Sequence, residues 1–314
     1  MRYLSLFLIA AALAGGFERP RGEERDGSAT KRRMDGPRLG LVFDTASRSL
    51  RPAFGLPGAV RIGDSLTDGT EIANAEVSPK HDSALAVDAA GAVFLVTGGG
   101  PAVALDVPAS PSRTLYSPGA SLAALAYPDT RQIRKLRFEN GAAVDAGTLE
   151  APDAATALAI SDRGAVLAAT GEGTVYLSDE TGTRTVGTVR KASAAVFLSD
   201  TEAAIADEGS DTVFLVRGDA LLPIAGDAQG VAGPAALAGV DGNRRVLVAN
   251  RRSGTVLSIG LDDGVTELTE CNCRPETLRR TLEPSVFWLN GTLLFDAKAQ
   301  GRVWFAPARE GGEN

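Results

Sequence analysis

The sequence predicts an all-β chain, a β-propeller of six or seven four-stranded blades. Two observations carry this prediction. Apolar runs of four to seven residues, rich in Val, Leu, Ala and Phe, alternate with turns of Gly, Asp, Asn or Ser, which is typical of strands rather than helices. The alternation also recurs as a larger unit about every 30 to 50 residues, the period of propeller blades.

The repeated unit is clearest at residues 240–265, where two apolar runs are separated by polar, glycine-bearing turns. Similar units occupy five further ranges: 83–106, 113–138, 155–187, 194–226 and 285–307. One unit has two apolar faces that it can bury only against its neighbours, so the sheets are expected to stack into a closed ring. Residues 49–82 decide between six and seven blades, and we favour seven.

Closure of the ring needs a link between the two ends of the chain. The hairpin at 39–55 resembles the outer half of a blade with no clear inner half before it. The C-terminal unit, which begins at Ser285, lacks an outermost strand in this interpretation. We therefore expect a strand at 39–54 to complete the C-terminal blade.

The N-terminus has the pattern of a secretory signal peptide over residues 1–15, with Arg2 before an apolar run and small residues after it. An uncleaved anchor is the alternative, although the run is short for a membrane span, which needs about 20 residues. Residues 16–36 are highly charged and are expected to form a flexible linker. The propeller is then expected over 37–310, with a disordered tail at 311–314, in a periplasmic or secreted protein that leaves the membrane after cleavage.

The charge of the chain argues against nucleic acid as a partner. The net charge is −7, with 32 basic residues dispersed among 39 acidic ones, so no concentrated positive field is expected. We expect a monomer.

The stretch "GPAALAGVDGNRRVLVANRRSGTVLSIGLDDG" resembles the NHL-repeat propellers. In that family a glycine-proline loop leads through an apolar strand, an Asp-Gly-Asn turn and a "VLVAN" strand to a third strand. In its overall order the chain also resembles a group of uncharacterised secreted bacterial propellers. These resemblances imply a propeller, six-bladed in the NHL family, and no particular activity.

Few residues suited to catalysis are present, and no catalytic residue is assigned. His81 is the single histidine, so a cage of several histidines cannot form, and we expect it to be an exposed loop residue. A Ser-His-Asp arrangement with Asp82 and Ser83 or Ser78 is the alternative. The only cysteines, Cys271 and Cys273, are expected to pair in an oxidising compartment and to shape one loop. A redox-active or metal-binding thiolate site is the less favoured alternative.

Ligands of propellers bind where loops gather around the central channel. We expect the turns between the second and third strands to form this face, at 97–100, 128–132, 170–173, 207–211, 250–254 and 297–301. Six polar residues on two of these turns are the candidate contacts: Asp207, Glu208, Asp211, Asn250, Arg251 and Arg252. Solvated turns without a ligand are the alternative.

Three functional classes fit these features. The favoured one is a secreted, non-catalytic propeller that binds a protein or a glycan through the loops at one face of the channel. The second is a lactonase-like metal-dependent hydrolase with one divalent cation, such as calcium, at the channel mouth. The third is a structural envelope protein. No metal ligand or other cofactor is assigned by the sequence.

Overall fold

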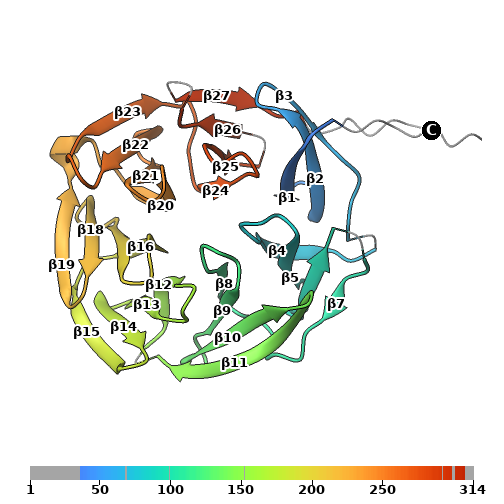
Figure 1. The fold of residues 1–314 in the computed structure, drawn as a ribbon, viewed down its shortest axis with the longest axis horizontal. Coiled ribbons are helices and arrows are strands. Elements are labelled where there is room, and N and C mark those ends of the chain that lie inside the picture. The colour runs from blue at the N-terminus through green and yellow to red at the C-terminus, as the bar shows by residue number, and fades with distance from the viewer. Residues whose placement is uncertain are drawn as a thin grey trace, which may run out of the picture. The chain divides into compact units, whose positions relative to one another are not determined.

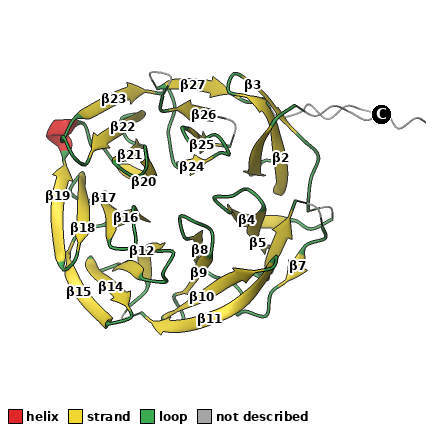
Figure 2. Ribbon diagram, viewed as in Figure 1, coloured by secondary structure: helices red, strands yellow, loops and turns green. Residues whose placement is uncertain are grey.

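The computed structural model describes residues 36–307 except 68, 99, 152, 292, 299 and 300. The expected signal peptide, nearly all of the expected linker and the expected tail therefore lie outside the described residues. Seven antiparallel sheets form a ring of blades, which confirms an all-β, seven-bladed propeller (Figure 1). The described residues hold no α-helix, only a 3₁₀ turn at Asp227–Gln229 (Figure 2). No helix there is long and apolar enough to cross a membrane.

We number the blades in chain order. Blade 1 contains β1 (Arg38–Asp44), β2 (Ser49–Leu56) and β3 (Ala59–Ile62). Blade 2 contains β4 (Ile72–Val77), β5 (Ser83–Asp88), β6 (Val93–Thr97) and β7 (Val103–Ala104). Blade 3 contains β8 (Arg113–Tyr116), β9 (Leu122–Tyr127), β10 (Gln132–Glu139) and β11 (Ala142–Glu150). Blade 4 contains β12 (Ala155–Ile160), β13 (Val166–Thr170), β14 (Thr174–Asp179) and β15 (Gly182–Thr188).

The remaining three blades follow the same order. Blade 5 contains β16 (Ala192–Phe197), β17 (Glu202–Asp207), β18 (Thr212–Arg217) and β19 (Ala220–Ala225). Blade 6 contains β20 (Pro234–Val240), β21 (Arg245–Asn250), β22 (Thr255–Gly260) and β23 (Thr266–Glu270). Blade 7 contains β24 (Arg279–Arg280), β25 (Val286–Asn290), β26 (Leu293–Asp296) and β27 (Arg302–Phe305).

The core of the described residues consists of seven apolar clusters, one between each pair of adjacent blades. Alternation along each strand produces this arrangement, because successive side chains point to opposite faces of a sheet. On β17, for example, Ile205 packs toward blade 4 and Ala206 toward blade 6. Each blade is therefore stable only between two neighbours, as the repeat pattern predicted.

The predicted closure of the ring is wrong. The strand expected at 39–54 does not join the C-terminal blade: it is β1 and most of β2, which pair with each other and with β3. Blade 7 is instead completed by β24, which pairs with β25 and lies upstream of Ser285. The sequence pattern missed β24 because its two residues are both arginines.

Blade 1 lacks the innermost strand that the other six blades have in the described residues. The turn after β1 meets the start of β4, since the Ile72 N–H donates to Arg48 O at 3.0 Å. The start of β1 meets the end of β24, since the Leu282 N–H donates to Leu39 O at 2.7 Å. Strand β1 therefore runs opposite to β4 and β24, as a second strand does, and blade 1 corresponds to the outer three strands of a blade. We call this junction of blades 7, 1 and 2 the seam.

Candidate functional site

Two of the six predicted ligand contacts, Asp207 and Asn250, are buried and hold loops of their own blades. The Asp207 carboxylate accepts from the backbone N–H groups of Arg190 at 2.8 Å and Lys191 at 2.7 Å. Burial works to raise the pKa of Asp207, but these hydrogen bonds and one from Ser210 outweigh it, so its pKa lies below the usual value. The carboxylate therefore ties the loop before β16 to the turn after β17.

Asn250 has the same position in blade 6 and is fully buried. Its side chain accepts from Ala232 N–H at 3.0 Å and donates to Gly230 O at 2.9 Å and to Thr255 Oγ1 at 3.1 Å. Asn290 repeats this role in blade 7, where it accepts from Glu276 N–H and donates to Arg274 O. An Asp or Asn at the end of the second strand thus anchors the entering loop in three consecutive blades.

The other four predicted residues pair across the junction of blades 5 and 6. Arg251 binds Glu208, and Arg252 binds Asp211. Lys191 also binds Glu208 at 2.8 Å, and its hydrogen bond, followed by that of Arg251, lowers the pKa of Glu208. The structure brings the predicted residues together, but mainly as contacts between blades, and none of the six lines the channel cavity described below.

Cys271 and Cys273 form a disulfide with a Cα–Cα distance of 5.1 Å. It lies in the loop joining blades 6 and 7, where the Cys271 N–H donates to Gly254 O at 3.0 Å. Gly254 has φ +69°, and a Cβ at that position would lie 2.7 Å from Cys273 O. The small disulfide loop therefore packs closely on the turn between β21 and β22 and shapes that loop locally.

Two of the turns expected at the ligand face are placed differently. Turn 97–100 follows β6 and turn 297–301 follows β26, so each joins a third strand to a fourth. Residues 99, 299 and 300 lie outside the described residues. The prediction slipped by one strand in these blades because β4 and β24 were not recognised.

The central channel contains a cavity of about 730 Å³. It is lined by the innermost strands of all seven blades and by several turns between first and second strands. Much of its wall is apolar, formed by Leu115, Leu158, Ile160, Val196, Phe197 and Leu237. A mostly apolar concavity of this size with a few polar groups is the usual form of a ligand site.

Charged groups of the cavity concentrate at the seam. Arg279 on β24 reaches across to blade 2, where its Nη2 lies 3.1 Å from Glu76 Oε2 and its Nη1 donates to Ala75 O at 2.9 Å. Burial raises the pKa of Glu76, and Arg279 opposes that effect. Arg280 points toward blade 6, where its guanidinium donates to Gly239 O. The guanidinium carbon lies 5.9 Å from the centroid of the Phe287 ring.

His81 is buried at the seam, with 3% of its surface exposed, so the expectation of an exposed loop histidine is wrong. Its Nδ1 accepts from Leu41 N–H at 2.9 Å, and its Nε2 therefore carries the proton and donates to Arg280 O at 2.7 Å. Gly40, with φ +136°, leaves room for the ring, because a Cβ there would lie 2.4 Å from Nδ1. The imidazole occupies an inner edge of β1 that a first strand would otherwise cover.

The alternative Ser-His-Asp arrangement does not form around His81. Ser78 Oγ donates to Asp82 at 2.9 Å and Ser83 Oγ donates to the same carboxylate at 3.1 Å. Both nitrogens of His81 are occupied by backbone groups instead. Burial lowers the pKa of His81, which favours the neutral ring that these two hydrogen bonds require.

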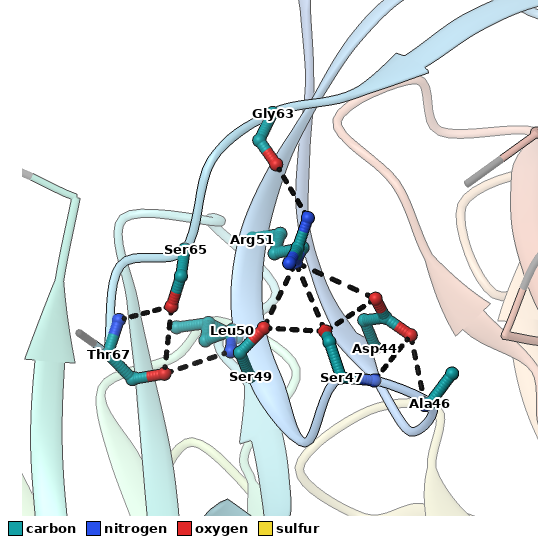
Figure 3. Close-up of polar contacts among 9 residues, drawn as sticks. All are labelled: Asp44, Ala46, Ser47, Ser49, Leu50, Arg51, Gly63, Ser65 and Thr67. Atoms are coloured by element: carbon teal, nitrogen blue, oxygen red, sulfur yellow. Dashed lines mark hydrogen bonds and ion pairs between the residues drawn. The ribbon is translucent and has the colours of Figure 1, made fainter. Parts of the chain in front are cut away.

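A second polar cluster surrounds Arg51 in blade 1 (Figure 3). The Arg51 Nε donates to Ser49 Oγ at 3.0 Å and to Ser47 Oγ at 3.2 Å, and Nη1 donates to Gly63 O at 3.3 Å. Ser47 Oγ also donates to Asp44 at 2.6 Å. These contacts fasten the β1–β2 turn to the chain that leaves β3, so the cluster stabilises blade 1 at the seam.

A divalent cation at the channel mouth is part of the hydrolase alternative that the sequence leaves open. Across the described part of the chain, no three His, Cys, Asp or Glu side chains come together as a group of metal ligands.

Comparison with known proteins supports the fold and identifies no family. No family model matches the sequence, and no curated protein matches it. The β-propeller domain of Cps50 (Swd1) from Myceliophteria thermophila is similar, with a TM-score of 0.53 at 12% identity over 87% of this chain and 97% of that one. A protein from Lactobacillus plantarum gives a TM-score of 0.58 at 16% identity, over 86% and 94%.

A chain from the mitotic checkpoint complex gives a TM-score of 0.58 at 10% identity, over 80% of this chain and 82% of that one. At such identities the likeness shows the fold alone. This chain is a seven-bladed β-propeller.

Proposed function

We propose that this chain is a secreted, non-catalytic binding protein whose protein or glycan ligand engages one end of the central channel. The cavity of about 730 Å³ carries the proposal, because every blade contributes to its wall. The polar turns at 207–211 and 250–254 are largely committed to contacts between blades, which favours the channel over those turns as the ligand site. We also propose that the chain is related to NHL-type propellers, which the resemblance of residues 233–264 supports.

A variant that fills the channel tests the proposal. Ala195 lines the cavity on β16, so Ala195→Trp should obstruct it. Arg252 lies in the turn between β21 and β22 and does not line the cavity, so Arg252→Ala removes its pair with Asp211 and leaves the channel open. Defined oligosaccharide and peptide libraries would be screened against the unmodified chain and both variants, with melting curves to verify folding. We expect at least one probe to bind the unmodified chain and Arg252→Ala, and to lose affinity for Ala195→Trp.

Two outcomes would contradict the proposal. Binding that survives Ala195→Trp but is lost in Arg252→Ala would place the site on the turns between second and third strands. Turnover of a lactone that depends on an added divalent cation would instead favour the hydrolase.

A further inference from the structure

Among the described residues that line the channel, Arg280 is a cation without a carboxylate partner. Glu76 and Arg279 neutralise each other at 3.1 Å. On the wall contributed by blade 4, Asp162 accepts from Gly119 N–H at 2.8 Å and from Ser121 Oγ at 3.3 Å. Arg280, by contrast, forms no ion pair within the described residues; its contacts are Gly239 O, His81 through its own backbone carbonyl, and the Phe287 ring.

The surroundings of Arg280 favour a counter-ion from outside the chain. Burial against the channel wall lowers the pKa of this guanidinium, so part of its hydration is lost even though the residue is exposed. Loss of hydration can be offset by a carboxylate in charge-assisted, bidentate hydrogen bonds. Arg280 is exposed on the cavity wall, which leaves its remaining donors accessible to such a group.

The adjacent strand carries a buried donor, the indole N–H of Trp288. Trp288 on β25 lines the cavity and is 3% exposed. Its indole N–H is buried and has no hydrogen-bond partner within the described residues. A buried N–H without an acceptor is uncommon, because it costs about 1–3 kcal/mol.

We infer that the channel binds a carboxylate attached to an apolar body, with Arg280 receiving the carboxylate and the apolar wall receiving the body. This inference rests on the proposed function and names the ligand class for the same channel. Trp288 lines the same cavity from the face of blade 7 that is turned toward blade 1, so its fluorescence can report an occupied channel. A fatty acid and the free C-terminus of an apolar peptide share this chemistry.

The test compares matched probes on the full chain by titration calorimetry. Decanoate is compared with decanol, and a capped tri-leucine peptide with a free C-terminus is compared with its amide. In a Trp304→Phe background Trp288 is the single tryptophan, so its fluorescence gives an independent readout. We expect the acids to bind ~10- to 100-fold more tightly than the neutral partners, as expected for a hydrogen bond to a charged group. The stronger acid of the two pairs identifies the source of the carboxylate.

Arg280→Gln should abolish the preference for acids, and Arg280→Lys should reduce it. Arg302→Gln, on the outermost strand of the same blade, is the matched control and should retain the preference. If Arg280→Gln fails to fold, the acid–neutral comparison on the unmodified chain still decides. Equal binding of acids and neutral partners would overturn the inference and leave the channel as a binding site. If no probe binds and the libraries also show no ligand sensitive to Ala195→Trp, the inference and the proposed function both fail.

Discussion

The junction of blades 5 and 6 and the seam of blades 7, 1 and 2 join adjacent sheets by different means. At the first junction, β16 and β20 are complete innermost strands in contact, and buried side chains such as Asn250 hold the connecting loops. At the seam no first strand of blade 1 is present in the described residues, and side chains cross the gap instead. His81 binds Leu41 and Arg280, while Arg279 reaches Glu76.

This difference shows how a ring can close without a complete set of strands. An apolar layer stabilises the junction of blades 5 and 6, and the ion pairs Arg251–Glu208 and Arg252–Asp211 cross it on exposed or partly exposed turns. The seam also has one ion pair, Arg279–Glu76, and differs in using a buried neutral imidazole, His81, whose contacts are sensitive to protonation. The seam also brings most of the charged groups of the channel to one side, so ring closure and the ligand cavity share residues.

The largest expected effect contrasts two buried side chains of similar size. Ile205, fully buried between blades 4 and 5, should cost about 4 kcal/mol of unfolding free energy on change to Ala, since the tightly packed layer keeps a closed void. Leu41, 1% exposed, lines the channel, so Leu41→Ala should cost only about 2 kcal/mol because the vacated space joins the cavity. Urea denaturation measures both. Equal losses would mean that the seam is packed as tightly as an ordinary junction.

The next effect compares equivalent positions at the ends of second strands. Asn250→Ala should cost about 3 kcal/mol, because it leaves buried groups at Ala232 and Gly230 without partners. Asp44→Ala at the seam should cost at most about 1 kcal/mol, because its contacts with Ala46 and Ser47 are exposed to water. Thermal and urea unfolding of both variants check the order. A larger loss for Asp44→Ala would show that the Arg51 cluster carries more of ring closure than its exposure indicates.

Repetition made the propeller predictable, because strand-length apolar runs and turns recur along most of the chain. The seven-blade count also followed from the extra strands near the N-terminus. The closure was mispredicted at one short strand: Arg279 and Arg280 have no apolar pattern, so β24 was missed and blade 7 was interpreted as starting at β25. The prediction therefore placed a missing strand at the outer edge of blade 7, whereas the unrecognised strand, β24, lies at its inner edge.

The candidate site was less predictable because its contacts join distant residues. The sequence predicted Glu208 and Arg251 as ligand contacts, whereas they pair with each other, because nothing in one sequence distinguishes an inter-blade ion pair from a ligand contact. His81 contacts Arg280 across 199 positions, and no local pattern indicates this. The one sequence feature that points to this contact is Gly40, because a glycine within an apolar strand can mark the close approach of another group, here the His81 ring.

A third prediction concerns the ion pair that spans the seam. Arg279→Ala should cost about 2 kcal/mol, because Glu76 loses its partner and Ala75 O loses a donor in a partly dehydrated site. Glu76→Gln should cost less, because an amide needs no counter-charge. A double-mutant cycle on urea unfolding should give a coupling of about 1 kcal/mol. Additive losses would show that the pair does not contribute to closure, and the Arg244–Asp262 pair within blade 6 provides an exposed control.

The smallest effect is the pH dependence of the imidazole at the seam. The pKa of His81 is lowered by burial first, with Arg38 acting in the same direction and Asp82 and the hydrogen bonds to Arg280 and Leu41 opposing. The unfolded chain therefore binds a proton near the usual histidine pKa of about 6.5, whereas the folded chain does not until a lower pH. The contribution of His81 is complete above that value and is lost as the pH falls toward the folded pKa.

His81→Gln removes this titration and should cost about 1 kcal/mol at pH 8, the usual worth of a neutral hydrogen bond. The difference in unfolding free energy between the unmodified chain and the variant should then shrink as the pH is lowered from 7 through the range just below it, because only the unmodified chain loses stability there. His81 is the only histidine, so the comparison isolates one group. A difference that stays constant with pH would mean that the imidazole titrates alike in both states and that the seam is indifferent to its charge.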